Sequence, residues 1–131
     1  KGTIQEALEI PGLGGPAGEL TEALECLEEV TAHLVGLARR GDPELFLADA
    51  TLYLEMFGIV AVGWQWLRQA IAAQRGLSSR PSQADSVFYQ GKLATFRYFL
   101  GYELPKIQGL ARRLTSGEYP TLEVREEHFE D

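Results

Sequence analysis

Two glutamates in largely apolar surroundings are the first candidates for chemistry. Glu55 lies in an almost entirely apolar run from residue 53 to residue 70, and Glu103 lies in a later run that is rich in aromatic residues. Burial raises the pKa of a carboxyl group unless a cation pairs with it, and Lys92 and Arg97 could supply that cation. Each glutamate is therefore either a general base or ligand contact, or one half of a structural ion pair. For Glu55 we favour an ion pair that fixes how two helices align.

The histidines and the single cysteine form no catalytic or metal-binding pattern. Helical di-iron proteins use Glu-x-x-His repeats on two helices, but Glu29 lies four residues before His33, and His128 lies in an acidic C-terminal stretch. Cys26 occupies a helical position among apolar residues, which indicates a buried and unreactive thiol. We therefore expect no catalytic residue, no bound cofactor and no metal ligand in this chain. A lone cysteine also fits a reducing compartment, so we expect a cytoplasmic protein.

Aromatic residues are concentrated in the same two runs. Such a stripe is more often core or interface than the lining of a ligand pocket. Trp64 and Trp66 point about 200° apart if the run is helical, so one of them is expected to meet another chain or domain. The aromatic residues of the two runs are Tyr53, Phe57, Trp64, Trp66, Phe88, Tyr89, Phe96, Tyr98, Phe99 and Tyr102.

Length and charge narrow the class of protein. The chain has 131 residues, which suits one domain with one core. Its net charge of −7 argues against binding of nucleic acid, because a phosphate backbone is bound by clustered Lys and Arg.

Residues 50–67 reach the lower length limit for a membrane span, but Glu55 and Gln65 interrupt this apolar run, so we expect no membrane span. The chain begins at Lys1 rather than Met, and residues 11–16 read as a linker, which suggests a piece of a longer polypeptide.

Apolar residues at three- and four-residue spacings predict three long helices, over residues 16–40, 42–75 and 82–114. The middle one is apolar nearly all round, so it is expected at the centre, buried on most sides. Short turns between the three predict an all-α fold, an antiparallel up-down-up bundle. Residues 3–10 could add a short fourth helix, so the expected divisions are a linker or short helix over 1–15, the bundle over 16–117 and an acidic tail over 118–131.

Several residues mark where these helices start, stop or bend. Asp42 followed by Pro43 is a good helix start, and Ser82 with an acidic residue three positions later resembles a capping box. Gly58 and Gly63 each cost up to about 1 kcal/mol relative to Ala inside a helix, which suggests close backbone contact or a bend. Pro105 interrupts the third helix and predicts a kink there rather than a full break.

Both runs resemble the C-terminal helical domain of a branch of the acyl-CoA dehydrogenases, the 3-methylmercaptopropionyl-CoA dehydrogenase-like enzymes. The resemblance covers about residues 18 to 117. It is carried by patterned positions rather than reactive groups: Tyr53-Leu54, Phe57-Gly58, Trp64-x-x-x-Arg68-Gln-Ala70, Phe88-Tyr89, Gly91-Lys92-Leu93-Ala94 and Glu103-Leu-Pro105.

The resemblance implies a parent enzyme that oxidises an acyl-CoA thioester to the 2,3-enoyl-CoA with FAD and an electron-transferring flavoprotein. The catalytic glutamate and the flavin contacts of that family lie in preceding domains, so this fragment is expected to be an accessory packing domain in a homo-oligomer. The alternatives are a free-standing helical module that self-associates and a small-ligand-binding bundle. The candidates for interface or structural contacts are Glu55, Trp64, Trp66, Arg68, Phe88, Tyr89, Lys92, Arg97 and Glu103.

Overall fold

The computed structural model of the protein describes residues 2–39, 44, 47 and 50–116. Helices are the only regular secondary structure in that part of the chain, so the all-α prediction is confirmed for it. The helix start predicted at Asp42-Pro43 and the acidic tail over 118–131 lie outside the described residues. In chain order the helices are α1 (Gly2–Leu8), α2 (Gly14–Arg39), α4 (Ala50–Ser78), α5 (Gln83–Tyr98), η1 (Phe99–Glu103) and α6 (Lys106–Thr115).

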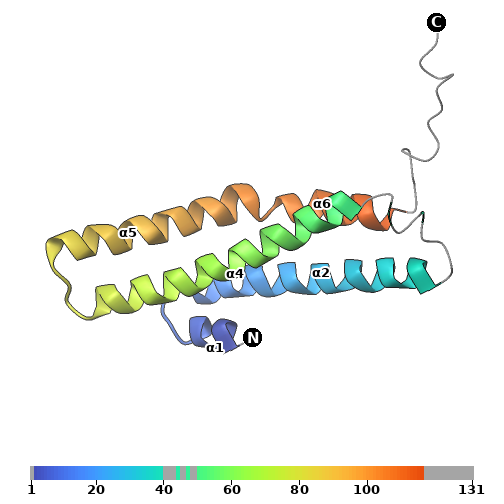
Figure 1. Ribbon diagram of the computed structural model, residues 1–131. Coiled ribbons are helices and arrows are strands. Elements are labelled where there is room, and N and C mark those ends of the chain that lie inside the picture. Colours follow the sequence, from blue (N-terminus) through green and yellow to red (C-terminus); the bar gives the residue numbers. More distant parts are fainter. Residues whose placement is uncertain (1, 40–43, 45–46, 48–49, 117–131) are drawn as a thin grey trace, which may run out of the picture.

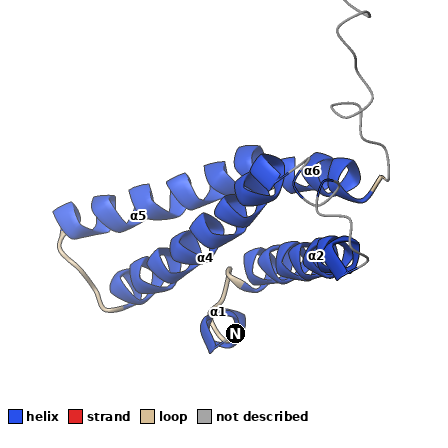
Figure 2. Cartoon of the chain, turned by 45° about the vertical axis from the view of Figure 1, so that its right-hand side comes forward, coloured by secondary structure: helices blue, strands red, loops and turns tan. Residues whose placement is uncertain are grey.

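α4 is the central element of the fold. It contacts each of the other helices of the described chain, whereas α2 packs mainly on α4 and α6. Figure 1 shows α4 and α5 joined by a tight turn, with α2 along the other side of α4 and α6 at the far end. In Figure 2, α4 lies between α5 and the pair formed by α1 and α2. The short helix expected over residues 3–10 is present as α1, and its Ala7 is fully buried.

The core between these helices is apolar. No polar or charged residue of the described chain is buried as a whole. α2 buries the stripe that its sequence spacing predicts, with Leu24 only half-buried. The largest fully buried side chains come from α2, α4, α5 and α6, so one core joins all four helices: Phe96, Leu20, Met56, Leu67, Leu114 and Val30.

Gly63 allows the closest approach within this core. A Cβ atom built at Gly63 would lie 2.7 Å from Cδ2 of Leu20 and 3.0 Å from Cε1 of Phe99. The residue is therefore a glycine because α2 and η1 both press on α4 at this point. Among the described residues, nothing lies within 4 Å of a Cβ built at Gly58, so of these two glycines only Gly63 shows the close contact.

The third predicted helix is divided into three helical segments. Around Pro105 the chain forms a π-helical turn, η1, in which the Leu104 N–H donates to the Phe99 carbonyl at 3.0 Å. Leu104 and Pro105 keep right-handed helical backbone angles, so the chain continues into α6. The wider turn accommodates a proline that cannot donate an α-helical hydrogen bond. The Ser82 cap is confirmed, because its hydroxyl accepts from the Asp85 N–H at 3.1 Å.

One long side of α4 is not covered by its neighbours. Leu54, Phe57 and Val62 are 67%, 51% and 47% exposed. The expectation that this helix is buried on most sides is therefore wrong for the side that carries these residues. α2 and α5 cover two sides of α4, and nothing in the described chain lies over the third. This side carries the three exposed apolar side chains together with exposed polar ones, among them Gln65 and Arg68.

Candidate interaction surface

Four of the predicted residues come together where α4 meets α5. Lys92 of α5 places its Nζ 5.6 Å from the centre of the Trp66 ring and 5.5 Å from the centre of the Phe88 ring. The same Nζ donates to Oε1 of Gln69 at 3.0 Å. The Phe88 and Tyr89 rings meet edge to face, with centroids 5.8 Å apart. The ammonium thus lies between two aromatic faces, an arrangement that the ring quadrupoles stabilise.

Tyr89 also closes the hairpin between α4 and α5. Its ring lies so close to Gly76 that a Cβ there would overlap it. A shallow depression of about 200 Å³ remains beside the ring, lined by Gln69, Ala72, Ala73, Phe88, Tyr89 and Lys92. The lining contains no carboxylate, histidine or cysteine, and the Lys92 amine is engaged by two rings and by Gln69, so these contacts join α4 to α5.

The ion pair expected for Glu55 is not formed. Glu55 is exposed, and no ion pair links it to Lys92 or Arg97 in the described part of the chain. The prediction is wrong because it assumed that the helix is covered all round. A carboxylate on the open side of α4 is solvated and needs no partner. Lys92 is engaged by aromatic rings instead, and Arg97 is exposed on α5.

Glu103 makes a local contact. Its Oε1 lies 3.1 Å from Nζ of Lys106, three residues later, and both side chains are well exposed. Such surface pairs contribute little to stability. Trp64 and Trp66 are both half-buried, so neither is displayed fully to solvent, and Arg68 is exposed.

A groove lies between α2 and α4, and sequence reasoning missed it. It has a volume of about 630 Å³ and is lined mainly by apolar atoms of both helices, together with Glu28 and Arg39. At its side the hydroxyls of Thr31 and Tyr53 share a hydrogen bond of 2.8 Å. Phe57 also lines the groove, next to Tyr53, with ring centroids 6.5 Å apart. The only sequence signal was the run of aromatic residues, which does not show which neighbouring helix they face.

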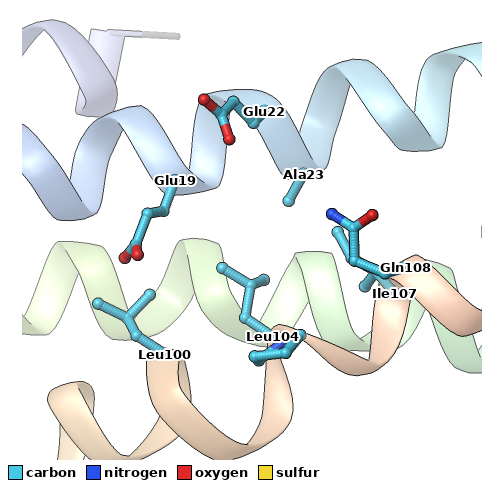
Figure 3. A pocket seen from close by; sticks show the side chains of 8 residues that line it. Glu19, Glu22, Ala23, Leu100, Leu104, Ile107 and Gln108 are labelled. Carbon is cyan, nitrogen blue, oxygen red and sulfur yellow. The ribbon is translucent and has the colours of Figure 1, made fainter.

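A smaller depression of about 200 Å³ lies where α2 faces the π-helical turn. Figure 3 shows Glu19 reaching from α2 towards Leu100, with Leu104 and Ile107 along the opposite side and the Gln108 amide near Ala23. Glu19 and Glu22 are exposed at its edge. The lining contains no histidine, no cation and no nucleophile, so it shows no arrangement of a nucleophile with an acid or base.

The remaining reactive groups are no better placed for chemistry. Burial, and next the Glu29 carboxylate, raises the pKa of the Cys26 thiol, which keeps it protonated and poorly nucleophilic. Across residues 2–39 and 50–116, no three His, Cys, Asp or Glu side chains gather as a metal site would require. No helix in the described ranges is long and apolar enough to cross a membrane.

Comparison with known families shows which family this helical domain belongs to. No curated protein gave a match to the chain. The family model described as acetyl-CoA dehydrogenase C-terminal like matches residues 1–125, which is nearly the whole chain and includes every helix described above. The chain therefore belongs to the acetyl-CoA dehydrogenase C-terminal like family.

Proposed function

We propose that the chain is the C-terminal packing domain of an FAD-dependent acyl-CoA dehydrogenase and contributes no catalytic group of its own. The observation that carries the proposal is the family match over residues 1–125. The parent enzyme would convert an acyl-CoA thioester to its 2,3-enoyl-CoA and pass electrons to an electron-transferring flavoprotein. It would be a cytoplasmic homo-oligomer of the 3-methylmercaptopropionyl-CoA dehydrogenase-like branch.

FAD belongs in the preceding domains rather than in this one. A dinucleotide diphosphate is held by cations or by backbone N–H groups at a helix N-terminus. The groove between α2 and α4 offers mainly apolar side chains, and its one cation, Arg39, is accompanied by the carboxylate of Glu28. These residues do not fit the cofactor, so no step of the reaction is assigned to this chain.

The working architecture of the chain would be an antiparallel up-down-up bundle of α2, α4 and the α5–α6 segment.

We propose that the groove between α2 and α4 receives the dehydrogenase body. Its lining is mainly apolar and includes Phe57, which is 51% exposed, and Leu54, three residues earlier on α4, is 67% exposed. Apolar side chains that remain exposed in one domain are the usual anchors of an interface with another.

A charge placed at Phe57 in the full-length enzyme tests this role. Phe57→Asp should lower the thermal midpoint of the whole enzyme and let a protease release the domain, because a buried unpaired charge weakens an interface. Val62→Asp is the matched control, since Val62 is 47% exposed on the same helix but does not line the groove.

In the isolated 131-residue chain both variants should unfold like the wild type, since both side chains are largely exposed. Trp64→Ala and Trp66→Ala in the full-length protein extend the test to the predicted tryptophans. If Phe57→Asp, Trp64→Ala and Trp66→Ala all keep wild-type assembly and thermal stability, the packing role is wrong.

A further inference from the structure

Two shallow depressions adjoin on α4 where this helix passes between α1 and α5. One, of about 180 Å³, lies between α1 and α4, and the other is the depression of about 200 Å³ beside Tyr89, between α4 and α5. Both are lined by Ala72, whose side chain is exposed, so they meet across α4. We call the two together the trough, and the residues that define it are Glu6, Arg68, Ala72, Arg75, Phe88 and Lys92.

The trough carries an excess of positive charge. Its lining contains three cations, Arg68, Arg75 and Lys92, and one carboxylate, Glu6. Arg75 pairs with Glu6 at 3.1 Å, whereas Arg68 is exposed and forms no ion pair within the described chain. The groove between α2 and α4 has one cation and one carboxylate, and the depression at η1 has two carboxylates and no cation. Of these three surfaces, the trough is the one that attracts an anionic partner.

An anionic segment follows α6 in the chain itself. Residues 117–131, which lie beyond the described part, contain six Asp or Glu and one Arg, a net charge of −5. Residues 2–39, with seven glutamates and one arginine, repel such a segment. Residues 50–116, with eight Lys or Arg and three Asp or Glu, attract it. Charge therefore directs this segment away from α1 and α2 and towards the α4–α6 part of the fold.

Phe129 makes the match with the trough more specific than charge alone. It lies between two acidic pairs, Glu126-Glu127 and Glu130-Asp131. In the trough, Nζ of Lys92 lies 5.5 Å from the centre of the Phe88 ring, which is 59% exposed. The segment thus offers a ring flanked by carboxylates, and the trough offers a ring flanked by cations. The two rings can pack together while the carboxylates meet the cations.

The segment is long enough to reach the trough. α6 packs on α4, and in both views it lies at the end of the bundle where α4 begins (Figures 1 and 2). From Ala50 to Ala72, α4 rises about 33 Å. An extended chain over residues 117–129 spans about 43 Å, so Phe129 reaches Ala72. Because the segment is attached, its effective concentration at the trough is roughly millimolar, and several weak contacts suffice to hold it.

We propose that residues 117–131 fold back on the trough of the same chain, with Phe129 beside Phe88 and the flanking carboxylates on Arg68 and Lys92. The inference goes beyond the proposed packing role, because it assigns a partner to a second surface of the domain. The groove between α2 and α4 remains for the dehydrogenase body.

Disulfide trapping in the 131-residue chain tests where the segment lies. Cys26→Ala removes the native thiol, and His128→Cys places a new one in the segment without removing a carboxylate. In this background, Ala72→Cys adds the second thiol in the trough, whereas Ala94→Cys adds it on α5 outside the trough. Circular dichroism checks that each variant keeps its helical content.

Ala94 is a matched control for Ala72. Both alanines are exposed on a helix. Ala94 lies as many residues before Ser116 as Ala72 lies after Ala50, so the segment has a similar distance to cover in each case. With glutathione disulfide as oxidant, the disulfide within one chain should form about tenfold faster at Ala72→Cys than at Ala94→Cys, because docking raises the local concentration of the thiol.

A charge reversal in the trough tests the cause of the docking. Arg68→Glu should slow trapping at Ala72→Cys about fivefold, since a repulsion replaces an attraction. Arg97→Glu is the matched control: it changes the net charge equally, and Arg97 is exposed on α5 outside the trough. The trapping rate in that variant should stay within about twofold of the parent rate, because exposed charges far from the contact are screened.

Three outcomes would each overturn the fold-back: equal trapping rates at Ala72→Cys and Ala94→Cys, a rate that Arg68→Glu leaves unchanged, or a disulfide that joins two chains instead of forming within one. Mass spectrometry of the unreduced protein distinguishes the last case. Each of these outcomes would leave the role on the dehydrogenase body standing, since that role is tested separately at Phe57 in the full-length enzyme.

Discussion

At the scale of single residues, Lys92 has contacts that join α4 and α5. Its ammonium contacts the Trp66 and Phe88 rings and donates to Gln69. Lys92→Met keeps most of the side-chain stem and removes the charge, so it should lower the free energy of unfolding by about 1 kcal/mol. Urea denaturation followed by tryptophan fluorescence measures this. Lys106→Met removes an exposed surface pair and should cost no more than about 0.5 kcal/mol. Equal effects of the two substitutions would argue against a stabilising role for the aromatic contacts.

Cys26 gives a prediction that depends on pH. Only the thiolate reacts with iodoacetamide, and a raised pKa leaves less thiolate at neutral pH. The folded chain should therefore react more slowly at pH 7 than the urea-unfolded chain, and the two rates should converge as the pH rises through the pKa of the folded thiol. Glu29→Gln removes the second cause of the shift and should move the folded profile to lower pH. An unchanged profile in that variant would show that the carboxylate has no influence on the thiol.

At the scale of helices, two glycines of α4 allow a matched comparison. Gly63→Ala should destabilise the chain, because the new Cβ would overlap Leu20 and the overpacking cost of about 1–3 kcal/mol exceeds the gain in helix propensity. Gly58→Ala adds the same methyl group where nothing lies within 4 Å, so it should stabilise by up to about 1 kcal/mol. Thermal unfolding of both variants measures the two signs. If both substitutions shift the midpoint in the same direction, the close packing at Gly63 is not the reason for that glycine.

The helices themselves could be predicted from sequence, because spacing and caps are local. The stripe of α2 and the Ser82 cap follow from residues close together in the chain. The π-helical turn could not be predicted, since a proline indicates a disturbance but not whether the helix bends, breaks or widens. The ion pair predicted for Glu55 is wrong for another reason. Whether one side of α4 is covered depends on where α2 and α5 pack, and the sequence of α4 alone carries no information about that.

At the scale of the whole molecule, charge divides the fold into two parts. Residues 2–39, which include α1 and α2, contain seven glutamates and one arginine, a net charge of −6. Residues 50–116 contain eight Lys or Arg and three Asp or Glu, a net charge of +5. Of the seven glutamates, Glu6 pairs with Arg75 of α4 at 3.1 Å. The five on α2 form no ion pair within the described chain, so they repel one another along one helix.

This repulsion predicts that salt stabilises the chain. Raising NaCl from about 10 mM to about 100 mM shortens the screening length from about 30 Å to about 10 Å, which weakens the repulsion most between glutamates that lie two or more turns apart on α2. The thermal midpoint should rise, by about 4 °C for each kcal/mol of repulsion relieved. The double variant Glu22→Gln/Glu25→Gln should have a higher thermal midpoint at low salt than the wild type, and its midpoint should rise less when salt is added. Glu103 lies on η1 and its carboxylate pairs with Lys106 of α6, so Glu103→Gln should leave the response to salt undiminished. A midpoint that falls with salt would mean that attraction between the acidic α2 and the basic α4–α6 layer outweighs repulsion within α2.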